Sequence, residues 1–311
     1  MSKNPHISWL KDIRKKDISS VGGKAANLGE LYSKFPIPDG FCINVRAFET
    51  FLEEVSIYGK ISALLKKIDV NKSGKIQSIS KNISKLITKS KIPKEIEAEI
   101  VKNYEKVKGF VAVRSSATAE DLEEASFAGQ QATFLNVTGK DLIKSVKECW
   151  ASYYSARAIT YRETKHFSHE PKMAVVVQQM VNAEKSGVTF TINPVTKNKN
   201  ELIIEAVFGL GESIVSGMVT PDHFVVDKKT ISIKEETINE KKTAIIMEKG
   251  KNKNVKLSSK KANSKTLNSK ELKEIANESI KIEKYYKKPM DIEWAIKDKL
   301  YILQARPVTT I

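Results

Sequence analysis

The chain has 311 residues, of which 41% are hydrophobic and 29% charged, and its formal net charge is +16. This length is enough to bury a large core and predicts two or three subdomains. No apolar run is long enough to cross a bilayer and no hydrophobic signal segment follows the first residues, so we expect a cytoplasmic protein without membrane contact.

The first predicted block covers residues 1–108. Within it, Val21–Leu31 indicates a glycine turn that runs into an amphipathic helix, and Pro36–Ile43 a turn followed by a strand. Residues 45–58 predict a second helix, and the Lys/Ile/Ser-rich stretch 61–107 predicts further helices without chemistry of their own. We therefore expect an N-terminal lobe that mixes helices and strands.

The second predicted block, residues 109–227, changes to strands and glycine-bearing loops. A buried strand over 110–114 carries Arg114 at its end, and residues 141–162 predict one long helix. The run 173–180 is apolar on both faces, which predicts a central strand of a sheet. Two further strands are expected at 188–192 and 201–207.

The helix predicted over 141–162 carries Trp150, Tyr153 and Tyr154 on its packing side. The two cysteines, Cys42 and Cys149, are not spaced as metal ligands. This spacing favours buried, reduced thiols over a disulfide or a nucleophile.

The third predicted block, residues 228–311, holds most of the excess charge. Residues 228–288 contain 18 Lys and 8 Glu and no Arg or Asp, a net charge of +10. Nucleic-acid binding is one interpretation of this stretch. Its Lys/Asn/Ser-rich segments 249–254 and 258–265 contain no aromatic residue, which favours the alternative, a solvated and mobile basic surface without a specific nucleic-acid partner. A helix is expected over 270–286.

The block ends in a predicted hairpin, with strands 290–296 and 300–307 and a tight turn at 297–299. Ile292, Trp294 and Ile296 alternate on one side of the first strand, and Tyr301, Leu303 and Ala305 are expected on the same side of the second. The polar residues are thereby gathered on the other side of the hairpin: Asp291, Glu293, Gln304 and Arg306.

If the hairpin register sets Glu293 beside Gln304, a carboxylate and an amide oxygen lie next to the Arg306 guanidinium. Oxygen ligands suit Mg²⁺ and a planar guanidinium suits phosphate, so together they could hold a metal-bound nucleotide triphosphate. The alternative is an ordinary hairpin whose solvated face is charged.

Three glycine-bearing segments could bring backbone N–H groups close to phosphates: residues 22–24, 124–134 and 208–212. Each could equally serve a turn alone. The same chain also carries Arg114 and Arg306 on predicted strands, and the Glu293–Gln304 pair. A purely structural role for all of these features together is harder to accept than for any one of them.

Five segments carry a resemblance to a known family: 21–31, 111–135, 187–194, 209–222 and 291–307. They resemble the ATP-grasp nucleotide-binding domain of phosphoenolpyruvate synthase (pyruvate, water dikinase), which also occurs in rifampicin phosphotransferase and in pyruvate, phosphate dikinase. The resemblance implies an α+β ATP-grasp fold with two to three subdomains around an ATP cleft. The three blocks would then be an N-terminal lobe (1–108), a central ATP-binding lobe (109–227) and a completing segment with the metal-binding hairpin (228–311).

The resemblance also implies roles for particular residues. Lys24 and Arg114 would contact the ATP phosphates, with Gly129 and Thr133 under the phosphate tail. Gln178 would face the adenine, and Glu184 or Glu205 would reach the ribose or the base.

In the hairpin, the resemblance makes Glu293 and Gln304 the Mg²⁺ ligands. Arg306 would stabilise the phosphoryl group in transfer, so Arg306, Arg114 and Lys24 form the expected catalytic set. Two positions depart from the family pattern, with Glu123 where Pro is common and Lys197 where Gly is usual.

By this resemblance we expect a kinase of the dikinase type that cleaves ATP to AMP and phosphorylates a carrier histidine. None of the four histidines lies in a carrier motif, so the carrier and the pyruvate- or phosphoenolpyruvate-binding domain would be supplied in trans. The alternatives are a non-catalytic, ATP-binding regulatory module and the ATP domain of a rifampicin phosphotransferase-like enzyme.

Overall fold

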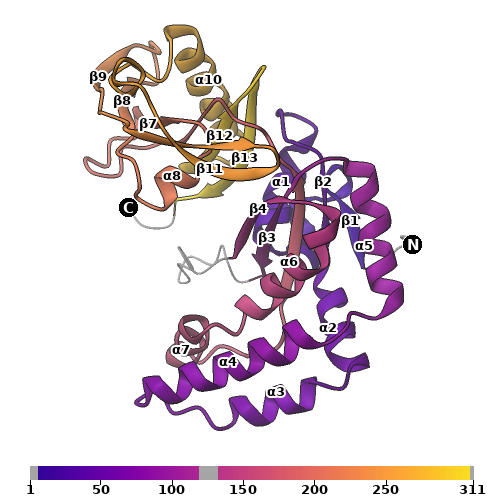
Figure 1. Ribbon diagram of the computed structural model, residues 1–311. Helices are drawn as coiled ribbons and strands as arrows, with labels where there is room; N and C mark the ends of the chain where they lie inside the picture. Colours follow the sequence, from indigo (N-terminus) through magenta and orange to yellow (C-terminus); the bar gives the residue numbers. More distant parts are fainter. Residues whose placement is uncertain (1–5, 119–131, 309–311) are drawn as a thin grey trace. The chain divides into compact units, whose positions relative to one another are not determined.

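The computed structural model describes residues 6–118 and 132–308, shown in Figure 1. The chain forms two compact units. The first consists of Met1–Glu30 and Asp39–Met180, and the second of Leu31–Pro38 and Val181–Ile311. The boundary at residue 180 falls inside the predicted central lobe, because the strand that ends there belongs to the sheet of the first unit. The division into three functional lobes, residues 1–108, 109–227 and 228–311, stays a prediction.

The first unit is built on a five-stranded antiparallel sheet in the order β1-β2-β5-β3-β4. Its strands are β1 (Ile7–Trp9), β2 (Gly40–Ile43), β3 (Val111–Ala117), β4 (Thr133–Val137) and β5 (Met173–Gln179). The prediction that residues 173–180 form a central strand is confirmed. Apolar residues on both faces suit this position because Met173–Gln178 are all buried.

Helices cover one face of this sheet, as Figure 1 shows for α6 beside β3 and β4. The helices in contact with the sheet are α2 (Val45–Glu54), α5 (Lys94–Val107) and α6 (Gly139–Ser152), whereas α3 (Tyr58–Leu65), α4 (Ser73–Lys89) and α7 (Ala156–Thr164) pack mainly on other helices. Their core centres on Trp150, whose ring stacks on Phe48 and Phe51 at centroid distances of 5.2 and 5.1 Å. The predicted helical character of residues 61–107 is confirmed.

The single helix predicted over 141–162 is wrong, because α6 and α7 are separate. Ser155 has an extended backbone and its side chain accepts a hydrogen bond from the Ala158 N–H, so it caps a new helix. The aromatic side was predicted correctly: Trp150, Tyr153 and Tyr154 are all buried.

Helix α1 (Ile18–Tyr32) follows two short 3-10 turns, η1 (Leu10–Asp12) and η2 (Lys15–Asp17). It is broken at Gly22, whose φ of 74° lies outside the helical region. A Cβ at this glycine would lie 2.2 Å from the Ser116 carbonyl oxygen, so no other residue fits without movement. The predicted glycine turn before a helix is confirmed, and it is packed directly on β3.

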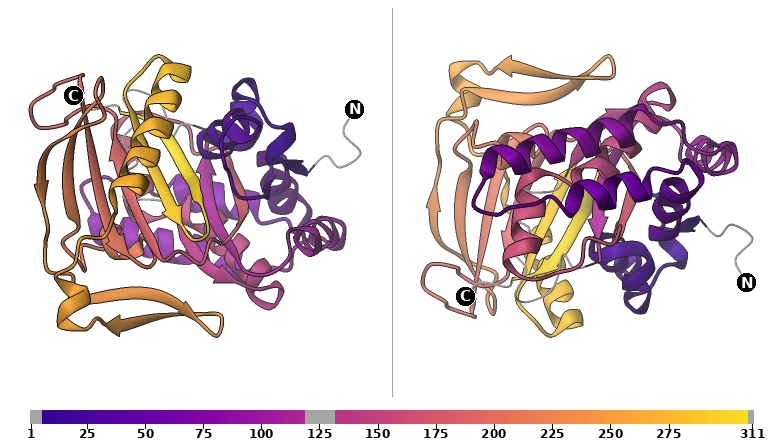
Figure 2. Two further views of the ribbon diagram at one scale, coloured as in Figure 1. Left: turned by 90° about the horizontal axis from the view of Figure 1, so that it is seen from above. Right: turned by 90° about the horizontal axis from the view of Figure 1, so that it is seen from below.

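The second unit contains a six-stranded antiparallel sheet in the order β13-β12-β6-β7-β8-β9. Its strands are β6 (Lys185–Phe190), β7 (Glu201–Phe208), β8 (Asp222–Asp227), β9 (Ile233–Thr237), β12 (Met290–Ile296) and β13 (Leu300–Pro307). Helix α10 (Ser269–Tyr286) lies beside β12, which both views of Figure 2 show. It is tied to the sheet by Lys185–Glu271 and Lys228–Glu283 ion pairs of 2.6 and 2.7 Å.

The basic stretch is more ordered than the sequence suggested. Besides β9 it forms the hairpin β10 (Thr243–Glu248) and β11 (Lys251–Lys256), which Figure 2 shows as a separate two-stranded ribbon, and the short helix α9 (Ser259–Ala262). At its base, Lys241 donates to Asp222, and both side chains are completely buried. The Asp222 carboxylate also accepts the backbone N–H groups of Asn239 and Thr266.

The closing hairpin has the predicted register but not the predicted alternation. Glu293 lies opposite Gln304, yet Trp294 lies opposite Ile302, so Leu303 is an additional residue in β13. This β-bulge changes which side chains of β13 face the same side as Trp294. Tyr301 and Leu303 are partly exposed. Their predicted place beside Trp294 was therefore wrong. No helix among the described residues is long and apolar enough to span a membrane.

Candidate functional site

Three of the predicted site residues share one face of the first unit's sheet. Arg114 pairs with Val176 on one side and with Thr133 on the other, and Gln178 lies two residues beyond Val176 on the same strand. Because cross-strand partners and alternate residues share a face, Arg114, Thr133 and Gln178 project from the same side. The helical core covers the opposite side, where Val175 and Val177 are buried.

Lys24 belongs to the same face through the Gly22 turn. The Ser116 hydroxyl donates to the Val21 carbonyl oxygen at 2.9 Å and accepts the Ala25 N–H at 3.2 Å, which fastens the start of the helix to β3. Lys24 lies between these two attachment points, and both Lys24 and Arg114 are more than nine-tenths buried. Two cationic groups and a helix start on one sheet face are suited to phosphate groups.

Gln178 has a feature that its environment does not explain. Its side chain is only 1% exposed, and its Nε2 amide has no hydrogen-bond acceptor among residues 6–118 and 132–308. A buried amide donor without an acceptor is costly, so a ligand with an acceptor atom would suit this position. Thr133 is exposed at the start of β4, whereas Gly129 lies outside the described residues.

The predicted hairpin set is brought together on one face of the second unit's sheet. Glu293 is the direct cross-strand partner of Gln304, and Asp291 is that of Arg306. Arg306 donates to one Asp291 oxygen, Oδ2, from Nε at 3.0 Å and from Nη2 at 2.8 Å. Burial raises the pKa of Asp291 above its ordinary value, although the Arg306 charge offsets part of this effect.

The same face continues across the sheet to Glu205. Glu293 pairs with Val188 of β6, which pairs with Glu205 of β7. Glu184 precedes β6, and its exposed carboxylate bonds to Lys297 in the hairpin turn at 2.6 Å. Of the two carboxylates suggested for the ribose or base, only Glu205 lies in line with the hairpin set.

The described part of the chain contains no cluster of three or more His, Cys, Asp or Glu side chains suited to a metal ion. In the predicted site, Glu293 supplies one carboxylate oxygen and Gln304 one amide oxygen, so the protein contributes two ligands. This number suits Mg²⁺, which usually retains waters and is held by one or two protein groups together with substrate phosphates. It does not suit a metal that requires a complete protein cage.

The third glycine segment is explained by structure. The Gly209 N–H donates to the Glu184 carbonyl oxygen and the Leu210 N–H to that of Ile245, at 2.8 and 2.7 Å. Gly209 has a φ of 77°, and a Cβ there would lie 2.2 Å from the Ile245 carbonyl oxygen. These two backbone donors are therefore used within the protein, and that of Leu210 attaches the segment to β10.

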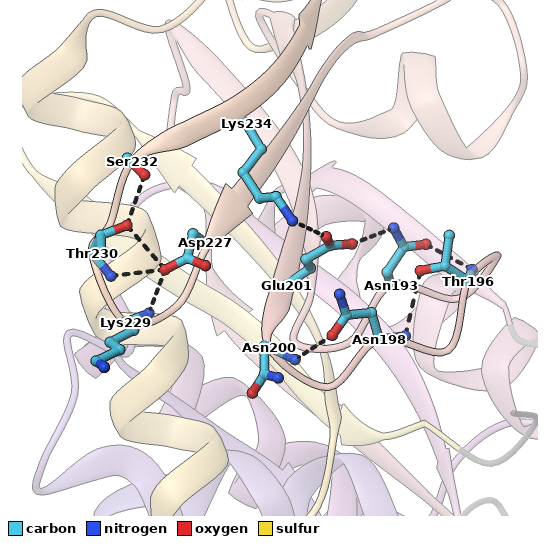
Figure 3. A network of polar contacts seen from close by, with 10 residues as sticks. All are labelled: Asn193, Thr196, Asn198, Asn200, Glu201, Asp227, Lys229, Thr230, Ser232 and Lys234. Carbon is cyan, nitrogen blue, oxygen red and sulfur yellow. Dashed lines mark hydrogen bonds and ion pairs between the residues drawn. The ribbon is translucent and has the colours of Figure 1, made fainter.

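A polar network holds the loop between β6 and β7 (Figure 3). Asn193 donates to Glu201 at 2.8 Å, and Lys234 donates to the other Glu201 oxygen at 2.5 Å. The Lys234 hydrogen bond holds the pKa of Glu201 below its ordinary value. Lys197, in this loop, has a φ of 59°, which explains why glycine suits the position.

Both cysteines are buried free thiols, as predicted. Burial raises the pKa of Cys42 and of Cys149 far above the ordinary value, so neither is activated as a nucleophile.

Two residues near the site were not assigned roles from the sequence. Asp291 orients Arg306, and its spacing of two residues from Glu293 was the available signal. His223 lies opposite Glu205, but this relationship depends on the pairing of β7 with β8, which no local pattern reveals.

The sheets and helices define an α+β protein with two polar sheet faces suited to a nucleotide. The family model of the pyruvate phosphate dikinase AMP/ATP-binding domain matches residues 18–311. The chain belongs to this family of ATP-binding domains, so the predicted recognition and the α+β, ATP-grasp-like fold class are confirmed.

Curated relatives carry names that agree with this assignment. The chain is 49% identical to a probable phosphoenolpyruvate synthase of Archaeoglobus fulgidus and 44% identical to one of Methanocaldococcus jannaschii, covering 98% of this chain and 42% and 27% of theirs. It is 42% identical to the phosphoenolpyruvate synthase of Pyrococcus furiosus, covering 98% of this chain and 44% of that one. The chain thus spans less than half the length of these relatives. A solved Pyrococcus horikoshii protein, PH1788, shares 12% identity over 68% of this chain and 79% of its own, with a TM-score of 0.33, too low to compare the folds.

Proposed function

We propose that the chain is the ATP-binding, phosphoryl-donating part of a phosphoenolpyruvate synthase-like dikinase. It cleaves ATP to AMP and phosphorylates a carrier histidine on another domain or chain. The observation that carries the proposal is the register of β12 and β13, which sets Glu293 opposite Gln304 and Arg306 opposite Asp291. The names of the longer relatives support the same reaction class.

In the transfer step a nitrogen of the carrier imidazole attacks the β-phosphorus of ATP. The bond between this phosphorus and the oxygen bridging to the α-phosphate breaks, and AMP leaves with that oxygen and its electron pair. The imidazole thereby receives the β,γ-pyrophosphoryl group, and attack of water on the γ-phosphorus then releases inorganic phosphate and leaves the β-phosphate on the histidine. The imidazole proton passes to solvent. Phosphoryl transfer depends mostly on positioning and charge neutralisation, so this part of the enzyme needs no nucleophilic side chain of its own.

The proposed roles follow the chemistry of each sheet face. On the first unit, Lys24 and Arg114 bind phosphate oxygens, Thr133 lies under the phosphate tail, and the Gln178 amide donates to the base. On the second unit, Arg306 stabilises the phosphoryl group in transfer, and Glu205 rather than Glu184 reaches the sugar or base.

Glu293 and Gln304 fit a Mg²⁺ ion through their oxygen atoms. When bound, this ion neutralises charge on the phosphate oxygens. Asp291 keeps the Arg306 side chain from swinging away, because two N–H groups are held on one carboxylate oxygen.

The test is incubation with Mg²⁺ and ATP labelled at the β-phosphate, with and without a carrier domain from a phosphoenolpyruvate synthase. We expect acid-labile phosphohistidine and AMP that depend on the carrier. Glu293→Ala and Arg306→Ala should each abolish most of the label, whereas Lys299→Ala in the adjacent turn should not. Tight ATP binding without AMP in any combination would replace the proposal with the non-catalytic regulatory module, and a carrier that passes label to an antibiotic would favour the rifampicin branch.

A further inference from the structure

One row of side chains crosses the whole six-stranded sheet of the second unit. Consecutive cross-strand partners along it are Gln304, Glu293, Val188, Glu205, His223 and Thr237. Direct partners share a face, so the row places Glu205 and His223 on the same face as the Glu293–Gln304 pair. Glu205 is two strands from Glu293, a separation of about 10 Å.

Glu205 and His223 contact each other within this row. The Glu205 Oε1 and His223 Nδ1 atoms are 3.6 Å apart, and the side chains are 31% and 35% exposed. The separation is longer than a hydrogen bond, so the carboxylate keeps capacity to accept bonds from a ligand. In the described ranges, His223 is the one side chain that makes a polar contact with Glu205.

The position of Glu205 decides what it can bind. A carboxylate repels phosphate oxygens but accepts hydrogen bonds from hydroxyl groups. If Mg²⁺ holds the phosphates at Glu293 and Gln304, the Glu205 carboxylate two strands away on the same face is placed for the hydroxyl groups of the nucleotide sugar. Glu184 is bonded to Lys297 and lies outside the row.

We infer that His223 is a positioning residue that directs the Glu205 carboxylate toward the sugar hydroxyl groups of ATP. This inference rests on the proposed function. Both residues project from central strands of a sheet, whose backbone is fixed on both sides by neighbouring strands. The imidazole restricts the rotamers of the carboxylate beside it, so less side-chain freedom is lost when the sugar binds.

The test measures sugar discrimination rather than overall affinity. Dissociation constants for ATP and for 2′,3′-dideoxy-ATP are determined calorimetrically for the wild type and for His223→Ala, His223→Asn and Thr237→Ala. The asparagine amide can place a donor near the position of Nδ1. Thr237→Ala is the matched control, because it changes the next residue of the row on the side away from Glu205.

We expect the wild type to bind ATP at least tenfold more tightly than the dideoxy analogue, as loss of hydrogen bonds to a charged group predicts. His223→Ala should lower this ratio by roughly threefold to tenfold without weakening the analogue, His223→Asn should restore most of it, and Thr237→Ala should leave it unchanged. The inference alone would be overturned if His223→Ala left the ratio of the two dissociation constants at its wild-type value. An equal loss of affinity for both nucleotides would be such a result. A wild-type chain that binds neither nucleotide would overturn the proposed function and the inference together.

Discussion

Asp291 and Arg306 face each other across β12 and β13, with the Nε and Nη2 atoms of Arg306 3.0 and 2.8 Å from a single Asp291 oxygen. The carboxylate is the more buried partner, with 13% of its side chain exposed against 40% for Arg306. The guanidinium is thus held at its base while part of it stays accessible to a ligand. In the proposed function, Asp291 therefore orients the Arg306 group that acts on ATP without taking part in ATP binding itself.

The first prediction is that Asp291→Asn slows carrier phosphorylation more than it weakens ATP binding. The neutral amide loses a charge-assisted bond to Arg306, and misplacement of a catalytic group costs on the order of 10²-fold in rate. ATP affinity should change by less than about threefold, because the proposed role of Asp291 is to orient Arg306 and not to bind the nucleotide. Single-turnover phosphorylation and calorimetric binding measure the two effects. Asp298→Asn, in the turn of the same hairpin, is the control, and a parallel loss of affinity and rate would refute the separation.

The second prediction concerns Gly22. Gly22→Ala places a Cβ 2.2 Å from the Ser116 carbonyl oxygen at a φ of 74°, so the start of the helix must move. We expect a loss of several kcal/mol of unfolding free energy, together with weaker ATP binding because Lys24 is displaced. Urea denaturation and nucleotide titration check these effects.

Gly59→Ala is the matched control for this change. A Cβ at Gly59 would meet nothing within 4 Å, and the residue lies within α3. Alanine there should leave stability unchanged or raise it by up to about 1 kcal/mol. Equal effects at Gly22 and Gly59 would show that the turn is not under steric constraint.

Local sequence patterns were sufficient to predict the strands that are marked by the spacing of their apolar residues. The central position of β5 follows from an apolar sequence on both faces, and the Glu293–Gln304 pairing follows from a hairpin whose two strands and short turn are continuous in the chain. The family resemblance supplied the roles of Lys24 and Arg114, which no local pattern assigns.

The parts that could not be predicted depend on competing local signals or on distant pairing. The break before α7 depends on a cap at Ser155, which a continuous apolar period hides. The bulge at Leu303 is invisible in a run of alternating residues. The approach of His223 to Glu205 needs the β7–β8 register, which is fixed by tertiary structure rather than by either segment alone.

The third prediction concerns the buried Asp222–Lys241 pair below the β10–β11 hairpin. Asp222→Ala leaves a buried ammonium without its carboxylate, which costs roughly 3–5 kcal/mol of unfolding free energy. The double variant Asp222→Leu with Lys241→Met should recover much of this loss, since it leaves no charge uncompensated. Urea denaturation measures each value.

The exposed pair Glu248–Lys253 provides the comparison for this experiment. Its side chains are 48% and 55% exposed, so Glu248→Ala should cost less than about 1 kcal/mol. If Asp222→Ala cost no more than this surface change, the buried pair would not anchor the hairpin.

The fourth prediction concerns the pH dependence of stability through His169. Arg162 donates from Nε to the His169 Nδ1 at 3.1 Å, so the ring proton lies on Nε2, which is 2.7 Å from Glu163. Burial lowers the pKa of His169 below its ordinary value, and the adjacent Arg162 charge acts in the same direction, although Glu163 opposes it. A proton on Nδ1 would face the Arg162 N–H group.

The sign of the effect follows from this lowered pKa. Below the unfolded-state pKa of about 6.5, the unfolded chain binds a proton that the folded chain resists, so stability falls as the pH is lowered from 6.5 toward the folded pKa. Above about 6.5 the contribution is fully present. We expect urea midpoints measured between pH 7.5 and 5.0, chosen to bracket the unfolded pKa of about 6.5, to fall more steeply for the wild type than for His169→Gln. His166→Gln, in the same loop but at an exposed residue, should retain the wild-type slope, and an unchanged slope in His169→Gln would assign the pH dependence to other groups.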